Sequence, residues 1–93
     1  MSARADKPPS AATVNAMGFA ILAAIGEDGP RPVSDLATIT GRHSSTVGFA
    51  IEALQTLGLI TAARPGRRPI LWALTPLGLN ELERLENLER SAA

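Results

Sequence analysis

The sequence contains no cysteine and no tyrosine, a single histidine, His43, and a single tryptophan, Trp72. Without cysteine, the chain has neither a disulfide framework nor a thiolate metal site. One histidine at the start of an expected helix is more typical of a helix cap or a phosphate contact than of a catalytic base. Motifs for a phosphate-binding glycine loop, a nucleophilic serine elbow or a zinc protease are also missing. We therefore expect no enzyme activity, no cofactor and no metal.

Long hydrophobic runs are missing as well. The longest uninterrupted apolar run covers residues 19–25, whereas a helix needs about 20 apolar residues to cross a bilayer. At the N-terminus, Asp6, Pro8 and Pro9 interrupt the basic-then-apolar layout of a signal peptide. These features, together with the lack of cysteine, favour a soluble cytoplasmic protein with no membrane partner.

The length of 93 residues and the hydrophobic content of 45% predict one domain with its own core. Residues 1–10 hold charges, small residues and two prolines without periodicity, and we expect a flexible arm there. We place the folded domain at residues 11–75 and a C-terminal helix at residues 76–93. Because a chain this short buries only part of its surface, we expect a second subunit to contribute.

The formal net charge is zero, but the charges are unevenly distributed along the chain. Between residues 29 and 72, five arginines face two carboxylates, which gives this part a net charge of +3. From residue 76 onward, two arginines face four glutamates, which gives −2. A basic middle and an acidic tail favour a molecule that docks through its middle and dimerises through its tail.

Apolar periodicity predicts three helices before residue 58. The first begins near Ser10 or Thr13, either of which can cap it, and ends in the glycine- and proline-rich segment 26–32. Its buried face consists of apolar residues spaced three and four apart, Val14, Met17, Ile21 and Ile25. We expect a very short strand at residues 32–33.

The second helix is expected to be capped by Ser34, to bury Leu36 and Ile39, and to end at Gly41 with a positive φ. The third helix begins at His43 or Ser44. Its core stripe is Val47, Ile51 and Leu54. Its outward residues are then Ser45, Thr46, Gly48, Phe49 and Glu52.

Two strands follow at residues 59–64 and 70–74, joined by the turn Arg64-Pro65-Gly66-Arg67-Arg68. Thr75 is expected to cap the last helix, with Pro76 at its first position, where a missing N–H costs nothing. This order of elements predicts an α+β fold that is mainly α. It is a winged helix-turn-helix with a three-helix core, a two-stranded wing and a C-terminal helix.

A helix and a basic loop in this order present two elements to a DNA duplex. We expect the third helix to enter the major groove and the arginine wing to contact the backbone or the minor groove. The predicted contact residues are Arg42, His43, Ser44, Ser45, Thr46, Gly48, Phe49, Arg64, Arg67 and Arg68. In the alternative, Gly48 is merely tolerated, Phe49 packs on a neighbouring helix or a second subunit, and the wing is a solvated basic hairpin. The outward face carries no Arg, Lys, Asn or Gln before Gln55, which counts against strong sequence reading.

Leucines at positions 77, 79, 82, 85 and 88 cover more than half of the circumference of the last helix. Such an arc is too wide for packing against one small core, so we expect one side to pack on the domain and the other on a partner. We assign Leu79, Leu82, Leu85 and Leu88 to a homodimer interface. In the alternative, this helix lies in a broad groove of its own monomer together with the first helix.

Over residues 20–83 the chain resembles the MarR-type and ArsR-type bacterial transcriptional regulators. The matching pieces, in order, are Asp35-Leu36-Ala37, Gly41, Ser45-Thr46-Val47, Leu54, Leu57-Gly58-Leu59-Ile60, the arginine turn and Leu74-Thr75-Pro76-Leu77-Gly78. The resemblance implies a winged helix-turn-helix that binds double-stranded DNA as a homodimer. The chain departs from the MarR type in its shortness, which leaves little room for an effector pocket, and in having Gly48-Phe49 where a polar or basic pair is common. The metal ligands of metal-sensing ArsR-type proteins are absent.

These observations together predict a transcriptional regulator, and specifically a repressor. A winged helix that has become a protein–protein interaction module without DNA binding is the alternative. The outward Phe49 and the zero net charge favour that alternative.

Overall fold

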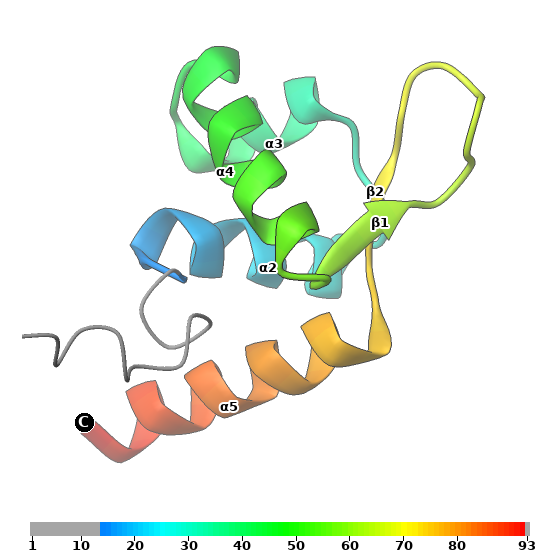
Figure 1. Ribbon diagram of the computed structural model, residues 1–93. Coiled ribbons are helices and arrows are strands. Elements are labelled where there is room, and N and C mark those ends of the chain that lie inside the picture. The colour runs from blue at the N-terminus through cyan, green and yellow to red at the C-terminus, as the bar shows by residue number, and fades with distance from the viewer. Residues whose placement is uncertain (1–13, 93) are drawn as a thin grey trace, which may run out of the picture.

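The computed structural model describes residues 14–92, so the arm expected at residues 1–10 lies outside the described part of the chain. Its elements are α2 (Ala16–Asp28), α3 (Val33–Thr40), α4 (Ser44–Thr56), β1 (Ile60–Ala62), β2 (Trp72–Leu74) and α5 (Pro76–Ala92) (Figure 1). The predicted α+β, mainly helical, winged fold is confirmed. None of the described helices is both long and apolar enough to cross a membrane.

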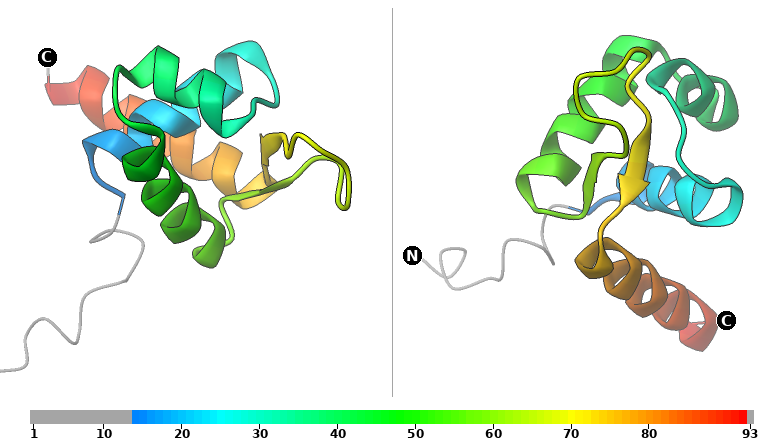
Figure 2. Two further views of the ribbon diagram at one scale, coloured as in Figure 1. Left: turned by 90° about the horizontal axis from the view of Figure 1, so that it is seen from above. Right: turned by 90° about the vertical axis from the view of Figure 1, so that its right-hand side faces the viewer.

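Helix α2 is the centre of the fold, because α3, α4, β2 and α5 all pack against it. The beginning of α4 and the hairpin loop lie on one side of the molecule, and α5 lies on the opposite side (Figures 1 and 2). The core takes side chains from every helix and from β1. Its buried members are Ile21, Leu22, Ala24, Ile25, Leu36, Val47, Ile51, Leu54, Leu59, Ile60 and Leu82.

The start of α2 differs from the sequence prediction, whereas its end lies within the predicted segment 26–32. The helix begins at Ala16, and its cap is neither Ser10 nor Thr13, which lie outside the described residues, but Asn15, whose Oδ1 accepts a hydrogen bond from the Gly18 N–H at 2.9 Å. The helix also continues through Gly26 to Asp28 before Gly29 ends it at φ +89°. Gly26 has a packing role, since a Cβ atom there would lie 2.7 Å from Leu82 Cδ2. It therefore brings α2 and α5 together and does not break the helix.

The prediction for α3 was partly wrong. The helix begins at Val33 after Pro32, without a side-chain cap, so Ser34 lies in the first turn and is not the N-cap. Leu36 is fully buried, but Ile39 is 50% exposed, because a helix of eight residues turns only a narrow stripe toward the core. The end of α3 was predicted correctly: Gly41 has φ +71°, and its N–H donates to the Ala37 carbonyl at 2.9 Å.

Helix α4 agrees with the prediction. His43 is its N-cap residue, Ser44 is its first residue, and Val47, Ile51 and Leu54 are its buried residues. The end of the chain also agrees, because the Gly78 N–H donates to the Thr75 hydroxyl at 2.9 Å and Pro76 begins α5. The Thr75 hydroxyl in turn donates to the Gly58 carbonyl at 2.6 Å, which ties this cap to the end of α4.

The two strands are antiparallel, with Ile60 opposite Leu74 and Ala62 opposite Trp72. They are shorter than predicted, since regular pairing ends at Ala62 and only one further main-chain bond, from the Ala63 N–H to the Leu71 carbonyl at 2.7 Å, precedes the loop. Prolines at 65 and 69 and the positive φ of Gly66 interrupt the ladder. A third segment pairs with β2 at Arg31, one residue before the short strand predicted at 32–33.

Candidate nucleic-acid interface

The residues predicted to contact DNA come from three neighbouring segments. Arg42 and His43 lie in the turn before α4, and residues 44–49 form the first turns of that helix. The arginine loop, residues 64–68, joins β1 to β2. All ten predicted contact residues are exposed except Gly48, which is half-buried. The structure therefore gathers them on the side of the molecule that faces away from α5 (Figure 2).

The outward face of α4 is unusually apolar at its centre. Phe49 is 73% exposed, and a Cβ atom on Gly48 would meet nothing within 4 Å beyond its chain neighbours and its own helix backbone. A shallow hollow of about 540 Å³ lies beside the ring. It is lined by Asn15, Ala16 and Met17 at the start of α2, by Arg42, and by Thr46, Phe49, Ala50 and Ala53 of α4. This face offers small and apolar side chains where hydrogen-bonding amides are common.

The arginine loop has a defined local conformation. The Arg67 N–H donates to the Arg64 carbonyl at 3.0 Å, and Arg64 Nη2 donates to the Pro69 carbonyl at 3.2 Å. Within the described residues, Arg67 and Arg68 take part in no ion pair. Their guanidinium groups are therefore available for an external anion, while Arg64 also supports the loop.

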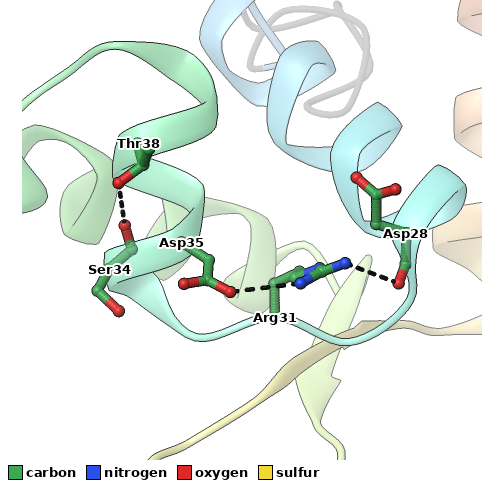
Figure 3. Close-up of polar contacts among 5 residues, drawn as sticks. All are labelled: Asp28, Arg31, Ser34, Asp35 and Thr38. Atoms are coloured by element: carbon green, nitrogen blue, oxygen red, sulfur yellow. Dashed lines mark hydrogen bonds and ion pairs between the residues drawn. The ribbon is translucent and has the colours of Figure 1, made fainter.

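Arg31 is a positioning residue that was not predicted from the sequence, where it is only one of the five arginines between residues 29 and 72. Its Nη1 lies 3.4 Å from Asp35 Oδ2, and its Nη2 donates to the Asp28 carbonyl at 3.3 Å (Figure 3). Its backbone exchanges two hydrogen bonds with Trp72, of 3.1 and 2.8 Å. Arg31 thus joins the end of α2, the start of α3 and the base of the hairpin. The i,i+4 spacing of Arg31 and Asp35 was the signal available in the sequence.

Trp72 lies at the base of the hairpin and packs against the core, so it anchors the wing. On α5, by contrast, the structure separates the four leucines assigned to the dimer interface. Leu82 is buried in the chain's own core and Leu85 is half-buried against it, whereas Leu79 and Leu88 are 46% and 55% exposed. The contact of α5 with α2 is the one described by the alternative interpretation, so only the exposed leucines stay available to a partner.

The acidic tail contains one well-formed ion pair. Arg84 reaches both carboxylate oxygens of Glu81, with Nη2 at 2.6 Å from Oε2 and Nε at 3.0 Å from Oε1. These hydrogen bonds hold the pKa of the Glu81 carboxyl below its ordinary value. The same contact raises the pKa of the Arg84 guanidinium. The pair lies on α5, far in the fold from the arginine loop (Figure 1).

Comparison with known proteins identifies the family. The family model described as HVO_A0114 matches residues 14–74, more than half of the chain. No curated protein matches the sequence. Several of the solved structures that match are described as transcriptional regulators, and the winged fold is common to them and to this chain.

Three of these structures illustrate the similarity. BpsR from Bordetella bronchiseptica, whose structure addresses regulation of its DNA binding by 6-hydroxynicotinic acid, has 26% identity and a TM-score of 0.77 over 86% of this chain and 58% of its own. A probable transcriptional regulator from Pseudomonas aeruginosa has 33% identity and a TM-score of 0.75 over 83% of this chain and 59% of its own. A MarR family regulator from Silicibacter pomeroyi has 21% identity and a TM-score of 0.78 over 88% and 56%, and supports the fold alone.

The chain therefore spans a little more than half the length of these regulators. The family match covers α2, α3, α4 and both strands, which are the elements that carry the candidate interface. The chain belongs to the HVO_A0114 family, and its fold is the winged helix-turn-helix of MarR-type transcriptional regulators.

Proposed function

We propose that the protein is a cytoplasmic repressor of transcription that binds double-stranded DNA as a homodimer. Helix α4 enters the major groove, and the arginine loop contacts the phosphate backbone or the minor groove. The protein needs neither a metal nor a cofactor for this and performs no catalysis. Repression follows from occupancy, because a compact dimer seated on a promoter excludes other proteins from the same stretch of DNA.

The observation that carries the proposal is the common orientation of α4 and the arginine loop. The exposed start of α4 and the exposed arginine loop lie on the same side of the molecule (Figure 1). The N-terminal N–H groups of a helix and nearby arginines both attract phosphate. The similarity to BpsR, whose DNA binding is described as regulated, supports the same role here.

The dimer is supported by the exposed apolar part of α5. Leu77, Leu79 and Leu88 are each between 46% and 56% exposed on a helix that already buries Leu82. Leu77 and Leu88 are eleven residues apart and lie on nearly the same side of the helix, so a two-fold axis beside α5 would bury these two leucines against the second copy. Such a dimer leaves both α4 helices free to bind two half-sites, which dimeric regulators of this kind recognise about one helical turn of DNA apart.

The test is fluorescence anisotropy of a labelled mixed-sequence duplex at two salt concentrations. Wild type is compared with Arg67→Ala/Arg68→Ala and with a matched control, Arg84→Ala/Arg90→Ala, which removes the same charge from α5. We expect salt-dependent binding that is strongly weakened in the loop variant and retained in the control, because phosphate contacts release counterions. Equal weakening in both variants, or no binding by folded wild type at low salt, contradicts the proposal.

The exposed Phe49 favours a second candidate function, a protein–protein interaction module without DNA binding. In that case an apolar segment of another protein covers the ring and the hollow beside it. The anisotropy experiment separates the two functions. An interaction module gives no DNA binding at any salt concentration, whereas a regulator binds DNA.

A further inference from the structure

The most exposed large hydrophobic side chain in the described residues lies in the middle of the candidate interface. Phe49, in the second turn of α4, is 73% exposed, although the chain has interior faces where a phenylalanine is stabilised by burial. A hollow lies beside the ring, and Ala50 and Ala53, the α4 residues that line it next to Phe49, are small. A surface that approaches α4 here meets the ring first.

The charges around Phe49 indicate what approaches it. Arg42 lines the hollow beside the ring, and the arginine loop is on the same side of the molecule (Figure 1). The carboxylate on α4, Glu52, lies about one turn farther along the helix and keeps phosphates away from that end. The region between Arg42 and Phe49 therefore suits a polyanion whose negative charges contact Arg42 and which presents an apolar group to Phe49.

The major groove has one such group. The 5-methyl of thymine is its apolar feature, and 5-methylcytosine presents a methyl at the same place, whereas the other base edges present donors and acceptors. The outward face of α4 has no amide or guanidinium group before Gln55 to satisfy those edges. We propose that Phe49 reads the 5-methyl group of a pyrimidine, so that α4 selects sequence by apolar contact while Arg42 holds an adjacent phosphate. This inference rests on the proposed DNA-binding function and adds the chemical group that is recognised.

The test uses one labelled duplex sequence in three forms: with thymine, with uracil at every thymine, and with uracil together with 5-methylcytosine at every cytosine. Wild type, Phe49→Leu and Phe49→Ala are titrated against each form at one salt concentration. Wild type should bind the uracil form about fourfold more weakly for each methyl contact, the factor equivalent to about 0.8 kcal/mol for a buried methylene. The 5-methylcytosine form returns methyl groups to the major groove at the cytosine positions, and it should recover affinity to the extent that one of these methyls lies against Phe49.

The variants separate a methyl contact from an effect of uracil on DNA shape. Phe49→Ala should bind all three forms equally, and Phe49→Leu should retain part of the preference. Because position 49 is exposed, both variants should unfold at the wild-type temperature, which thermal melting checks. Equal wild-type affinity for all three forms, with salt dependence intact, overturns the methyl contact and leaves DNA binding standing. A change of oligomeric state in Phe49→Ala with an unaltered preference also overturns it, because a second copy then covers the ring. Absence of all DNA binding overturns the proposed function together with this inference.

Discussion

Gly78, in the first turn of α5, lies directly against the main-chain carbonyl of Leu59, the residue before β1. A Cβ atom at position 78 would overlap that carbonyl oxygen, which already accepts a hydrogen bond from the Thr75 N–H at 3.0 Å. At this point the start of α5 thus meets the end of the three-helix core through main-chain atoms. A side chain of any size at position 78 would separate the two.

We predict that Gly78→Ala lowers the free energy of unfolding by about 3 kcal/mol or more, the upper end of the range for overpacking, because main-chain atoms cannot move aside as a side chain can. Gly48→Ala is the matched control, since it also replaces a helical glycine but meets nothing within 4 Å. It should raise stability by up to about 1 kcal/mol through helix propensity. Chemical unfolding followed by circular dichroism measures both. A Gly78→Ala variant as stable as wild type would show that α5 does not pack here.

The leucines of α5 should fall into two classes. Leu82→Ala should cost about 2–4 kcal/mol of folding free energy, because it removes a buried side chain that packs beside Gly26. Leu88→Ala should leave the unfolding of the monomer nearly unchanged and weaken self-association, because Leu88 is exposed. Sedimentation equilibrium and chemical unfolding distinguish the two effects. Unaltered self-association in both Leu88→Ala and Leu79→Ala would argue against a dimer through α5.

Replacing Arg67 or Arg64 of the arginine loop should have different effects on DNA binding and on the conformation of the loop. Arg67→Ala should reduce the slope of log affinity against log salt by about one per protomer, without affecting thermal stability. Arg64→Ala should reduce the slope and also loosen the loop, because Arg64 donates to the Pro69 carbonyl. Anisotropy titrations over a range of salt, with hydrogen exchange of the loop amides, provide the two readouts. Identical exchange in both variants would show that Arg64 has no supporting role.

The Glu81–Arg84 pair predicts a pH-dependent contribution to stability. The pKa of Glu81 is lowered in the folded chain from its ordinary value of 4.5, so the pair stabilises above that pH and the stabilisation is lost as the pH falls through the lower, folded value. Arg84→Gln should therefore melt below wild type at pH 7, and the difference should shrink as the pH falls below 4.5. Arg90→Gln is the control, because Arg90 bonds the neutral Asn87 at 3.3 Å. A constant Arg84→Gln difference over this range would contradict the assignment.

The parts of the fold that the sequence predicted correctly are those fixed by local chemistry. The positive φ of Gly41, the Thr75 cap with Pro76, and the buried stripe of α4 each depend on residues within a few positions of one another. The wrong or missing predictions depended on distant contacts. The packing role of Gly26 could not be predicted because its partner, Leu82, is far along the chain, and the outward position of Ile39 follows from how α3 docks on α2 and α4.

The candidate interface was predictable for the same reason. Arg42 to Phe49 and the arginine loop are short segments whose order alone indicated a winged helix, and the structure gathers them on one side of the molecule. Arg31 was missed as a positioning residue because its pairing with Trp72 joins segments 41 residues apart. The sequence could also not predict which α5 leucines are buried and which are exposed, because this depends on the angle at which α5 crosses α2.

The contact between Gly26 and Leu82 also affects how two protomers would be arranged on DNA. In the proposed dimer, α5 joins the two protomers, and α2 supports the α4 helix that enters the major groove. The distance between α2 and α5 therefore affects how the two α4 helices are positioned relative to each other along the duplex. The absence of a side chain at position 26 thus allows the closest approach of α2 and α5. A bulkier residue at position 26 would leave each α4 helix able to bind DNA. It would change the number of base pairs between the two half-sites that the dimer binds best.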